Sequence, residues 1–230
     1  MKQQKNIIII PARGGSKRLP KKNLILLNEK PLIEYTLDYA KANLNIAERV
    51  IVSTDDEEIK DISLKNGIEV QKRPEELSGD NVPTVDVLKH VITELDDDFD
   101  NVILLQVTNP LRPKDLLSKA YRTYIDGGYS SLMTVTRNFQ KFGKIVNDEF
   151  VPYNYEIGQR SQDLEPLYFE NGLLYITKTS LIEKGQIMGV NNFPYIVNHP
   201  FAHVDIDTKE DLDWASFLAN SKSSNEESTS

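Results

Sequence analysis

Residues 7–23 decide the fold, and they read Ile7-Ile8-Ile9-Ile10-Pro11-Ala12-Arg13-Gly14-Gly15-Ser16-Lys17-Arg18-Leu19-Pro20-Lys21-Lys22-Asn23. The four isoleucines are apolar on both faces of an extended chain, which is typical of a parallel strand buried between layers of helices. Paired glycines and several cations follow directly. Because the turn after a strand is where α/β proteins bind phosphate groups, the stretch predicts a strand and a phosphate-binding loop.

The loop has the chemistry that a triphosphate requires. Glycines let backbone N–H groups approach phosphate oxygens, and lysine and arginine neutralise the charge. The loop lacks the G-x-x-x-x-G-K-[ST] spacing of Walker A and the G-x-G-x-x-G spacing of dinucleotide sites, which weakens ATPase and dehydrogenase interpretations. The simpler alternative is a solvated basic turn, and the position directly after the first strand favours the phosphate site over it.

The rest of the chain alternates short β-branched runs with helical periodicity. Strands are predicted at Ile7–Ile10, Val50–Ser53, Val102–Val107, Ser131–Thr136 and Leu173–Thr177. Helices are predicted from Pro31, from 55–58 to Gly67, over Val85–Leu95, over Leu116–Tyr124 and over Leu212–Leu218. This order predicts an α/β fold with a mostly parallel sheet and helices on both faces. Ligands are then expected in the loops after Ile10, Val52 and Val107.

Two segments break this rhythm. Residues 137–170 are rich in aromatic side chains and show no helical period, which predicts an excursion from the sheet, such as a hairpin. Residues 221–230 are rich in Ser, Glu and Asn and are predicted to be a disordered tail. Residues 1–220 are therefore expected to form a single domain.

Charge and composition narrow the function classes. The net charge of −8 argues against general nucleic-acid binding, yet no acidic residue precedes Glu29 while seven cations do. This local excess suits a small polyanion. The chain has no cysteine, the run Ile7–Ile10 is too short for a signal-peptide core, and nothing approaches the roughly 20 apolar residues of a membrane span. A cytoplasmic protein that does not enter a membrane is expected.

The loop resembles the signature of the N-acylneuraminate cytidylyltransferases (CMP-sialic acid synthetases), I-P-A-R-x-G-S-K-x-L-P-x-K-N, at every fixed position from Ile10 to Asn23. Further stretches agree in order: Ser53-Thr54-Asp55, Arg73-Pro74 with Leu77 and Asp80, Leu104-Leu105-Gln106, Pro110-Leu111-Arg112, Asn171-Gly172 and Asp205-Ile206-Asp207. The resemblance spans about residues 6–218. It implies a three-layer, Rossmann-like nucleotide-sugar transferase fold whose 137–170 excursion makes a homodimer and completes the neighbouring site.

The resemblance also implies a nucleotide site. Arg13 and Lys22 would be catalytic, holding the triphosphate and stabilising charge on the transferring phosphorus. The nucleotide-binding set would be Ala12, Arg13, Gly15, Ser16, Lys17, Lys22, Asn23, Arg73, Asp80 and Thr84. Taken alone, Arg73 is better explained as a surface arginine before a proline turn, and only its place in the ordered set of motifs reverses this.

The sugar acid would be bound by Gln106, Arg160 and Asn171, with the Arg160 guanidinium on the carboxylate. Taken alone, Gln106 is equally well a strand-end glutamine bonded to backbone. The family usually reads Gln-Pro-Thr-Ser-Pro where this chain reads Gln106-Val107-Thr108-Asn109-Pro110. These two departures bear on which sugar is bound. Lys141 and Lys144 are alternative candidates for a substrate-facing lysine.

Asp205 and Asp207 are the expected ligands of Mg²⁺. Residues two apart in an extended segment point to the same side, and Mg²⁺ takes one or two carboxylates with phosphate oxygens and water. A competing interpretation makes Asp207 the N-cap of the last helix, in a capping box with Glu210.

The predicted activity is transfer of CMP from CTP to a nine-carbon keto-sugar acid of the sialic acid type, with Mg²⁺ assisting and pyrophosphate leaving. Pseudaminic, legionaminic and 3-deoxy-octulosonate-type acids are alternative acceptors, because each carries a carboxylate beside an anomeric hydroxyl. A non-catalytic nucleotide-binding domain is the alternative from another class. The sequence assigns no general base.

Overall fold

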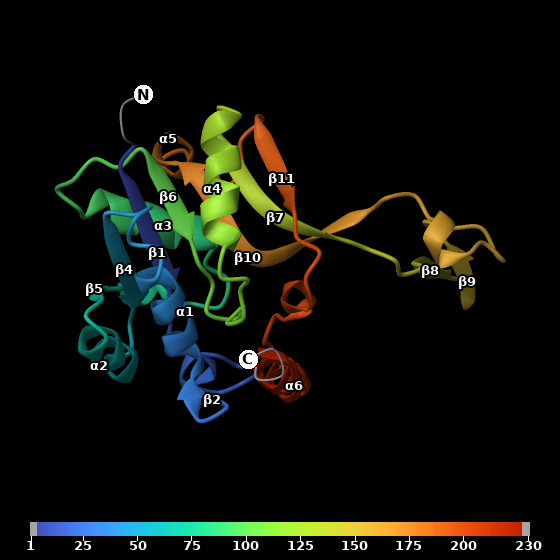
Figure 1. Cartoon of the computed structure of the whole chain (residues 1–230), viewed down its shortest axis with the longest axis horizontal. Helices are drawn as coiled ribbons and strands as arrows, with labels where there is room; N and C mark the ends of the chain where they lie inside the picture. Colours follow the sequence, from blue (N-terminus) through green and yellow to red (C-terminus); the bar gives the residue numbers. More distant parts are fainter. Residues whose placement is uncertain (1–3, 227–230) are drawn as a thin grey trace.

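A computed structural model describes residues 4–226. Its centre is a seven-stranded sheet of order β11-β7-β10-β6-β1-β4-β5 (Figure 1). The strands are β1 (Asn6–Pro11), β4 (Arg49–Thr54), β5 (Glu69–Lys72), β6 (Asn101–Leu104), β7 (Ser131–Arg137), β10 (Tyr168–Lys178) and β11 (Asn192–Ile196). β1, β4, β5 and β6 are parallel, whereas β10 runs antiparallel to both of its neighbours. The predicted α/β class with a mostly parallel sheet is confirmed.

The isoleucine run feeds two separate cores. Ile8 and Ile10 belong to the core with α1 (Leu32–Lys41), α2 (Glu57–Lys65) and α4 (Leu116–Asp126). Ile7 and Ile9 belong to the opposite core, with α3 (Thr84–Thr93) and α5 (Thr179–Ile182). All four side chains are fully buried, as expected for a strand covered on both faces. The fold therefore has three layers.

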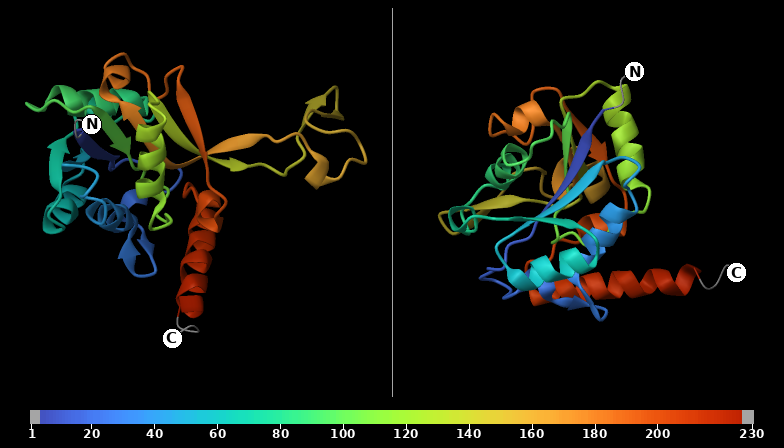
Figure 2. Two further views of the ribbon diagram at one scale, coloured as in Figure 1. Left: turned by 45° about the horizontal axis from the view of Figure 1, so that its top comes forward. Right: turned by 90° about the vertical axis from the view of Figure 1, so that its left-hand side faces the viewer.

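Residues between β7 and β10 leave the sheet as a long arm. The arm carries a two-stranded antiparallel sheet, β8 (Gly143–Val146) and β9 (Glu149–Pro152), and a short 3₁₀ helix, η3 (Ser161–Asp163). Figures 1 and 2 show it projecting far from the main sheet. The hairpin suggested for residues 137–170 is present.

The structure differs from the sequence prediction in several boundaries. β6 ends at Leu104, so Gln106 lies in the following loop, although Leu105 N still donates to Ile9 O at 3.2 Å. The edge strands β5 and β11 were not predicted. Two short strands, β2 (Leu26–Leu27) and β3 (Lys30–Pro31), precede α1, and Pro31 is its N-cap.

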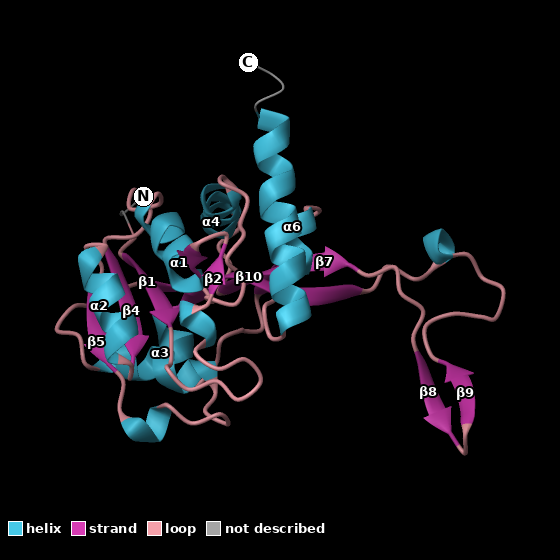
Figure 3. Ribbon diagram, turned by 90° about the horizontal axis from the view of Figure 1, so that it is seen from below, coloured by secondary structure: helices cyan, strands magenta, loops and turns pink. Residues whose placement is uncertain are grey.

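The last helix, α6 (Lys209–Glu226), is longer than predicted and stands beside the sheet, as Figure 3 shows. Its final residues, 221–226, fall in the segment predicted to be disordered, and residues 227–230 lie outside the described part. Within residues 4–226, no helix combines the length and apolar character that a membrane span needs.

Candidate active site

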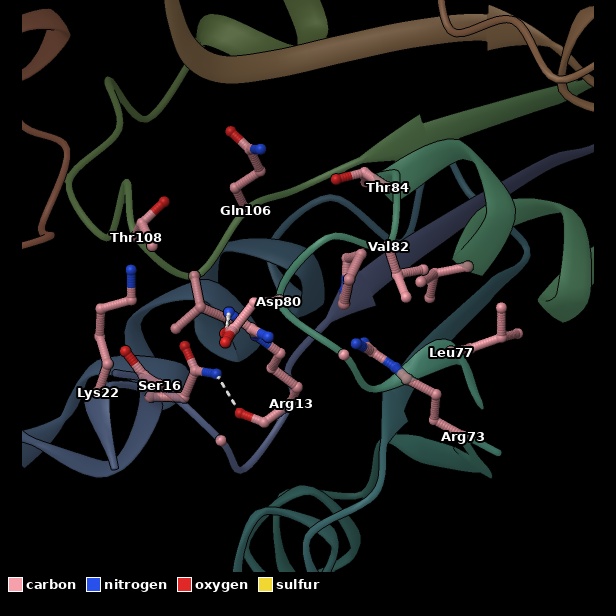
Figure 4. A pocket seen from close by; sticks show the side chains of 16 residues that line it. Arg13, Ser16, Lys22, Arg73, Leu77, Asp80, Val82, Thr84, Gln106 and Thr108 are labelled. Carbon is pink, nitrogen blue, oxygen red and sulfur yellow. Dashed lines mark hydrogen bonds and ion pairs between the residues drawn. The ribbon is translucent and has the colours of Figure 1, made fainter. Parts of the chain in front are cut away.

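A cavity of about 260 Å³ opens at the carboxyl ends of β1 and β6. Its wall comes from the loop after β1, the 73–84 segment and the loop after β6, as predicted for an open α/β sheet. Figure 4 shows Lys22 and Thr108 at one side and Arg73 and Leu77 at the other. Nine predicted site residues line it: Arg13, Gly15, Ser16, Lys22, Asn23, Arg73, Asp80, Thr84 and Gln106.

Two of the five cations of the loop, Arg13 and Lys17, pair with Asp80. Arg13 Nη2 and Lys17 Nζ each lie 2.7 Å from its carboxylate oxygens, and Arg13 Nη1 also donates to Ser78 O at 3.4 Å. The bond from Lys17, followed by that from Arg13, lowers the pKa of Asp80 although partial desolvation opposes this. Asp80 therefore orients Arg13 at the cavity wall. Lys17 is mostly exposed and stands at the rim.

Two further cations of the loop, Arg18 and Lys22, pair with Asp207. Lys22 Nζ donates to Asp207 Oδ1 at 2.6 Å, and Arg18 Nη2 lies 2.8 Å from Oδ2. The Lys22 side chain is only 16% exposed, so its ammonium is held inside the cavity. Ion pairs thus join the loop after β1 to the segment before α6.

The two glycines of the loop have different roles. A Cβ on Gly14 would lie 2.6 Å from Asp56 Oδ2, and Gly14 N donates to Asp55 Oδ1 at 2.9 Å. Gly14 is therefore required for the loop to lie against the start of α2, where Asp56 caps the helix by accepting from Ile59 N. A Cβ on Gly15 would meet nothing within 4 Å, so Gly15 leaves open space beside the cavity.

Asn23 and Arg73 are both largely buried and both line the cavity. Asn23 Nδ2 donates to Arg13 O at 2.8 Å, which fixes the orientation of the amide and leaves its oxygen and its second N–H proton for a ligand. Arg73 Nη2 donates to Ser53 O at 2.6 Å and Nε to Ser53 Oγ at 3.3 Å. Burial lowers the pKa of Arg73 to about 10, and the nearby charge of Arg13 adds to this. Two guanidinium groups thus share one cavity, which favours an anionic ligand.

Two predicted site residues, Ala12 and Asn171, are buried in the fold and do not line the cavity. Ala12 is fully buried, and its N–H donates to Ser53 O at 2.9 Å, so it fixes the loop's origin. Asn171 is also buried: Oδ1 accepts from Thr134 Oγ1 at 2.6 Å and from Leu173 N at 3.1 Å, and Nδ2 donates to Thr136 Oγ1 at 2.9 Å. Asn171 thus holds the bend of β10 together.

Arg160 lies on the arm, where its guanidinium makes a bidentate pair with Asp163, at 2.7 and 3.2 Å. Lys141 and Lys144 are on the arm as well and lie over the rings of Tyr155 and Tyr153. Within one chain, the arm's cations are not brought to the cavity (Figure 1).

Asp205 and Asp207 flank the Lys22 side of the cavity. Partial desolvation raises the pKa of Asp205, the charge of Asp207 adds to this, and a hydrogen bond with Thr108 and the charge of Lys22 oppose it. Among the described residues, no group of three or more His, Cys, Asp or Glu side chains forms a complete metal site. A pair of neighbouring carboxylates still fits Mg²⁺, because this ion commonly takes one or two and completes its shell from phosphate and water.

The capping-box interpretation of Asp207 is wrong by one residue. Asp211 Oδ2 accepts from Thr208 N at 2.8 Å, and Asp211 N donates to Thr208 Oγ1 at 3.3 Å. The reciprocal box therefore joins Thr208 and Asp211, and Glu210 has no part in it. The Asp207 side chain is turned to the cationic loop, which separates its charge from the stability of α6.

The residue that sequence reasoning missed is Asn109. Its side chain is fully buried and bonded to two backbone carbonyl oxygens, Asn171 O at 3.1 Å and Val204 O at 2.8 Å. Its departure from the family pattern was the available signal, but sequence does not show where a loop amide points.

Residues 7–224 match the family model described as Cytidylyltransferase, and the chain belongs to that family. It is 33% identical over 215 residues to an N-acylneuraminate cytidylyltransferase of Streptococcus agalactiae, covering 90% of this chain and 52% of the relative. It thus spans about half the length of this and similar curated relatives. It is 34% identical over 224 residues to a pseudaminic acid cytidylyltransferase of Campylobacter jejuni, covering 93% and 96%.

Solved structures of the same fold include a CMP:2-keto-3-deoxy-manno-octonic acid synthetase complexed with CTP. It matches with a TM-score of 0.70 at 17% identity, covering 95% of this chain and 99% of that one. A 4-diphosphocytidyl-2C-methyl-D-erythritol synthase from Anaerococcus prevotii matches with a TM-score of 0.64 at 16% identity, covering 95% and 100%. The Rossmann-like nucleotidyltransferase fold is confirmed.

Proposed function

We propose that this chain transfers the CMP group of CTP to a nine-carbon keto-sugar acid of the sialic acid type and releases pyrophosphate. The observation that carries the proposal is the cationic loop at the cavity wall. Four of its five cations are held by Asp80 and Asp207 at 2.6–2.8 Å, in positions from which they can turn to phosphate oxygens. The family membership and the names of the relatives support the choice of CTP and an acidic sugar.

Cytosine would lie at the Arg73 side of the cavity. The Asn23 amide oxygen can accept from the 4-amino group of cytosine, because the bond from its nitrogen to Arg13 O fixes the orientation of the amide. Arg73 Nη1 can donate to the base carbonyl, since Nε and Nη2 are bonded to Ser53. Uracil would place an oxygen against the Asn23 oxygen, which predicts discrimination against UTP.

The triphosphate would extend toward Lys22. The Arg13 guanidinium and the Lys22 ammonium can contact phosphate oxygens and stabilise the charge that develops at the α-phosphorus. The anomeric hydroxyl oxygen of the sugar attacks that phosphorus in line. The bond from the α-phosphorus to the oxygen bridging to the β-phosphorus breaks, pyrophosphate leaves with the electron pair, and the hydroxyl proton is lost.

Asp205 and Asp207 would hold Mg²⁺ at the same side. When bound, this ion neutralises phosphate charge that the loop cations do not reach. Asp205 is the better placed of the two, because both Asp207 oxygens are paired with cations of the loop. Gln106 lines the cavity above Thr108 and can bond to the sugar acid (Figure 4).

A second copy of the chain would supply the remaining contact to the sugar carboxylate, Arg160. A two-stranded sheet is at best marginally stable by itself, and β8–β9 exposes large apolar side chains, including Ile145 at 71% and Phe150 at 53%. A groove of about 1080 Å³ between the arm and α6 includes six Phe, Tyr and Trp side chains in its lining. Apolar surface of this kind marks an interaction site, and a homodimer would cover it.

A pyrophosphate-release assay tests the function. The purified chain is supplied with CTP, Mg²⁺ and each of N-acetylneuraminic, pseudaminic, legionaminic and 3-deoxy-octulosonic acid, and products are identified by mass spectrometry. A CMP-sugar with N-acetylneuraminic acid as the best acceptor is expected, with CTP strongly preferred over UTP. No release with any acid would contradict the proposal, and equal use of UTP would contradict the placement of cytosine. Because the substrate is CTP, we expect the enzyme to work in the cytoplasm.

A further inference from the structure

Residues 204–206 carry Asp205 into the site, and a loop fixes them at successive points. Ile206 N donates to Thr108 O at 2.8 Å, and Thr108 Oγ1 in turn donates to Asn109 Oδ1 at 3.4 Å. Just before it, Val204 O accepts from Asn109 Nδ2 at 2.8 Å. The position of the Asp205 carboxylate therefore depends on where the loop after β6 holds this segment.

Asn109 ties that loop to a third element. The same Nδ2 that bonds to Val204 O also donates to Asn171 O at 3.1 Å, at the bend of β10. Asn171 is itself held by Thr134 and Thr136 of β7. One buried amide thus connects the Asp205 segment to the central sheet, and both protons of its nitrogen are used in doing so.

The backbone of β10 is shaped to admit this amide. Gly172 has a φ of +73°, which glycine adopts readily. A Cβ at this position would lie 2.7 Å from Asn109 Oδ1 and 2.8 Å from Gln106 Oε1. Gly172 therefore lets two amides of the loop after β6 pack against the bend, one of which, Gln106, lines the cavity.

We infer that Asn109 is a positioning residue for Asp205: its amide clamps residues 204–206 to the bend of β10, so that the Asp205 carboxylate is presented to the metal that accompanies CTP. Asn109 does not line the cavity and acts only through the segment that it holds. The inference rests on the proposed function, because it assigns Asp205 to the metal. Side chains that orient metal ligands typically contribute about 10–100-fold to metal affinity.

Asn6 provides a matched control. It is equally buried, and its Nδ2 also makes two donated bonds, to Ile46 O and to Tyr121 Oη, both at 2.8 Å. It begins β1, whereas the cavity lies at the opposite end of that strand. Asn6→Ala and Asn109→Ala therefore remove similar bonds, and only Asn109→Ala removes them beside Asp205.

The experiment measures CTP binding by calorimetry, without sugar acid, in EDTA and then in Mg²⁺. Wild-type protein should bind CTP at least about tenfold more tightly in Mg²⁺, and Asp205→Asn should lose this gain. Asn109→Ala should keep its affinity in EDTA within about twofold and lose most of the gain, whereas Asn6→Ala should lose only thermal stability. Should Asn109→Ala not fold, Asn109→Ser, with one hydroxyl donor, should retain an intermediate gain.

Each result is decisive. An undiminished Mg²⁺ gain in folded Asn109→Ala or Asn109→Ser would overturn the positioning role while leaving the proposed function intact. A wild-type protein without any Mg²⁺ gain would overturn the metal assignment of the proposed function, and the inference with it.

Discussion

The loop after β1 and the arm between β7 and β10 each carry an arginine expected to bind substrate, and their surroundings differ. Arg13 is held by Asp80 and by Ser78 O, from a segment about 65 residues further along the chain, at the wall of a cavity. Among the described residues, Arg160 is paired with Asp163 alone, three residues away, on an arm that projects from the body. Contacts between distant segments of one chain therefore fix the arginine of the nucleotide site. On the proposed function, a second copy of the chain completes the acid-binding side, so the two substrates would depend on different levels of assembly.

Arg13→Ala should break the nucleotide side and have the largest effect. Loss of a donor to developing phosphate charge typically lowers kcat by about 10²–10³, or about 3 kcal/mol. The thermal midpoint should change little, because the side chain is partly exposed. Steady-state kinetics and thermal unfolding measure the two effects, with Arg122→Ala, on the exposed face of α4, as the control. Normal turnover per folded molecule would show that Arg13 belongs to a solvated basic turn and does not contribute to catalysis.

Two neighbouring residues separate the chemistry of the nucleotide site from the stability of α6. Asp207 pairs with cations of the loop, whereas Thr208 caps the helix. Asp207→Asn should lower kcat by about tenfold or more, since it removes the partner that holds Lys22. It should leave α6 stable. Thr208→Ala should instead cost about 0.5–2 kcal/mol of stability with near-normal turnover. The same effects in both variants would show that charge and cap are one unit.

Arg160→Ala should break the acid-binding side alone. Loss of a bidentate bond to a carboxylate should raise KM for the sugar acid by about tenfold, with KM for CTP nearly unchanged. Asp163→Ala is the matched control, because it frees the guanidinium from its present partner and keeps the charge. Equal damage to both substrates in Arg160→Ala would mean that the arm also supports the nucleotide side.

Asp205→Asn should have the smallest of the expected effects, a slight increase in the free energy of unfolding at pH 7. The pKa of Asp205 is raised in the folded protein, so the native state binds more protons than the unfolded state as pH rises through that range. Ionisation of Asp205 therefore lowers stability above its ordinary pKa. Asp205→Asn should raise the thermal midpoint slightly at pH 7 and not at pH 3. A midpoint that falls at pH 7 would contradict this.

Sequence predicted the centre of the sheet and missed its edges. The run Ile7–Ile10 is apolar on both faces and could be recognised as a buried strand. β5 reads Glu-Val-Gln-Lys, and β11 contains Pro194. Edge strands are often charged, and proline is tolerated there because one side needs no partner, so neither gives the pattern of a buried strand.

The candidate site was predicted to a similar extent. Arg13, Lys22, Asn23 and Arg73 could be placed because a local motif or an ordered set of motifs marks them, and the cavity brings them together. The roles of Asn171 and Asn109 depend on contacts between distant segments, which one sequence does not reveal. The cap at Thr208 was missed because two overlapping boxes fit the same residues.

The comparison between the two regions rests on one claim: the arm of one chain completes the site of another. Hybrid dimers test it most directly. Arg13→Ala and Arg160→Ala chains, carrying different tags, are co-expressed, and the hybrids are purified and assayed at a sugar-acid concentration at which each parent is nearly inactive. If the arm acts across the dimer, one site in each hybrid carries both substitutions and the other carries neither, so about half of wild-type activity should return. Hybrids as inactive as their parents would contradict the claim.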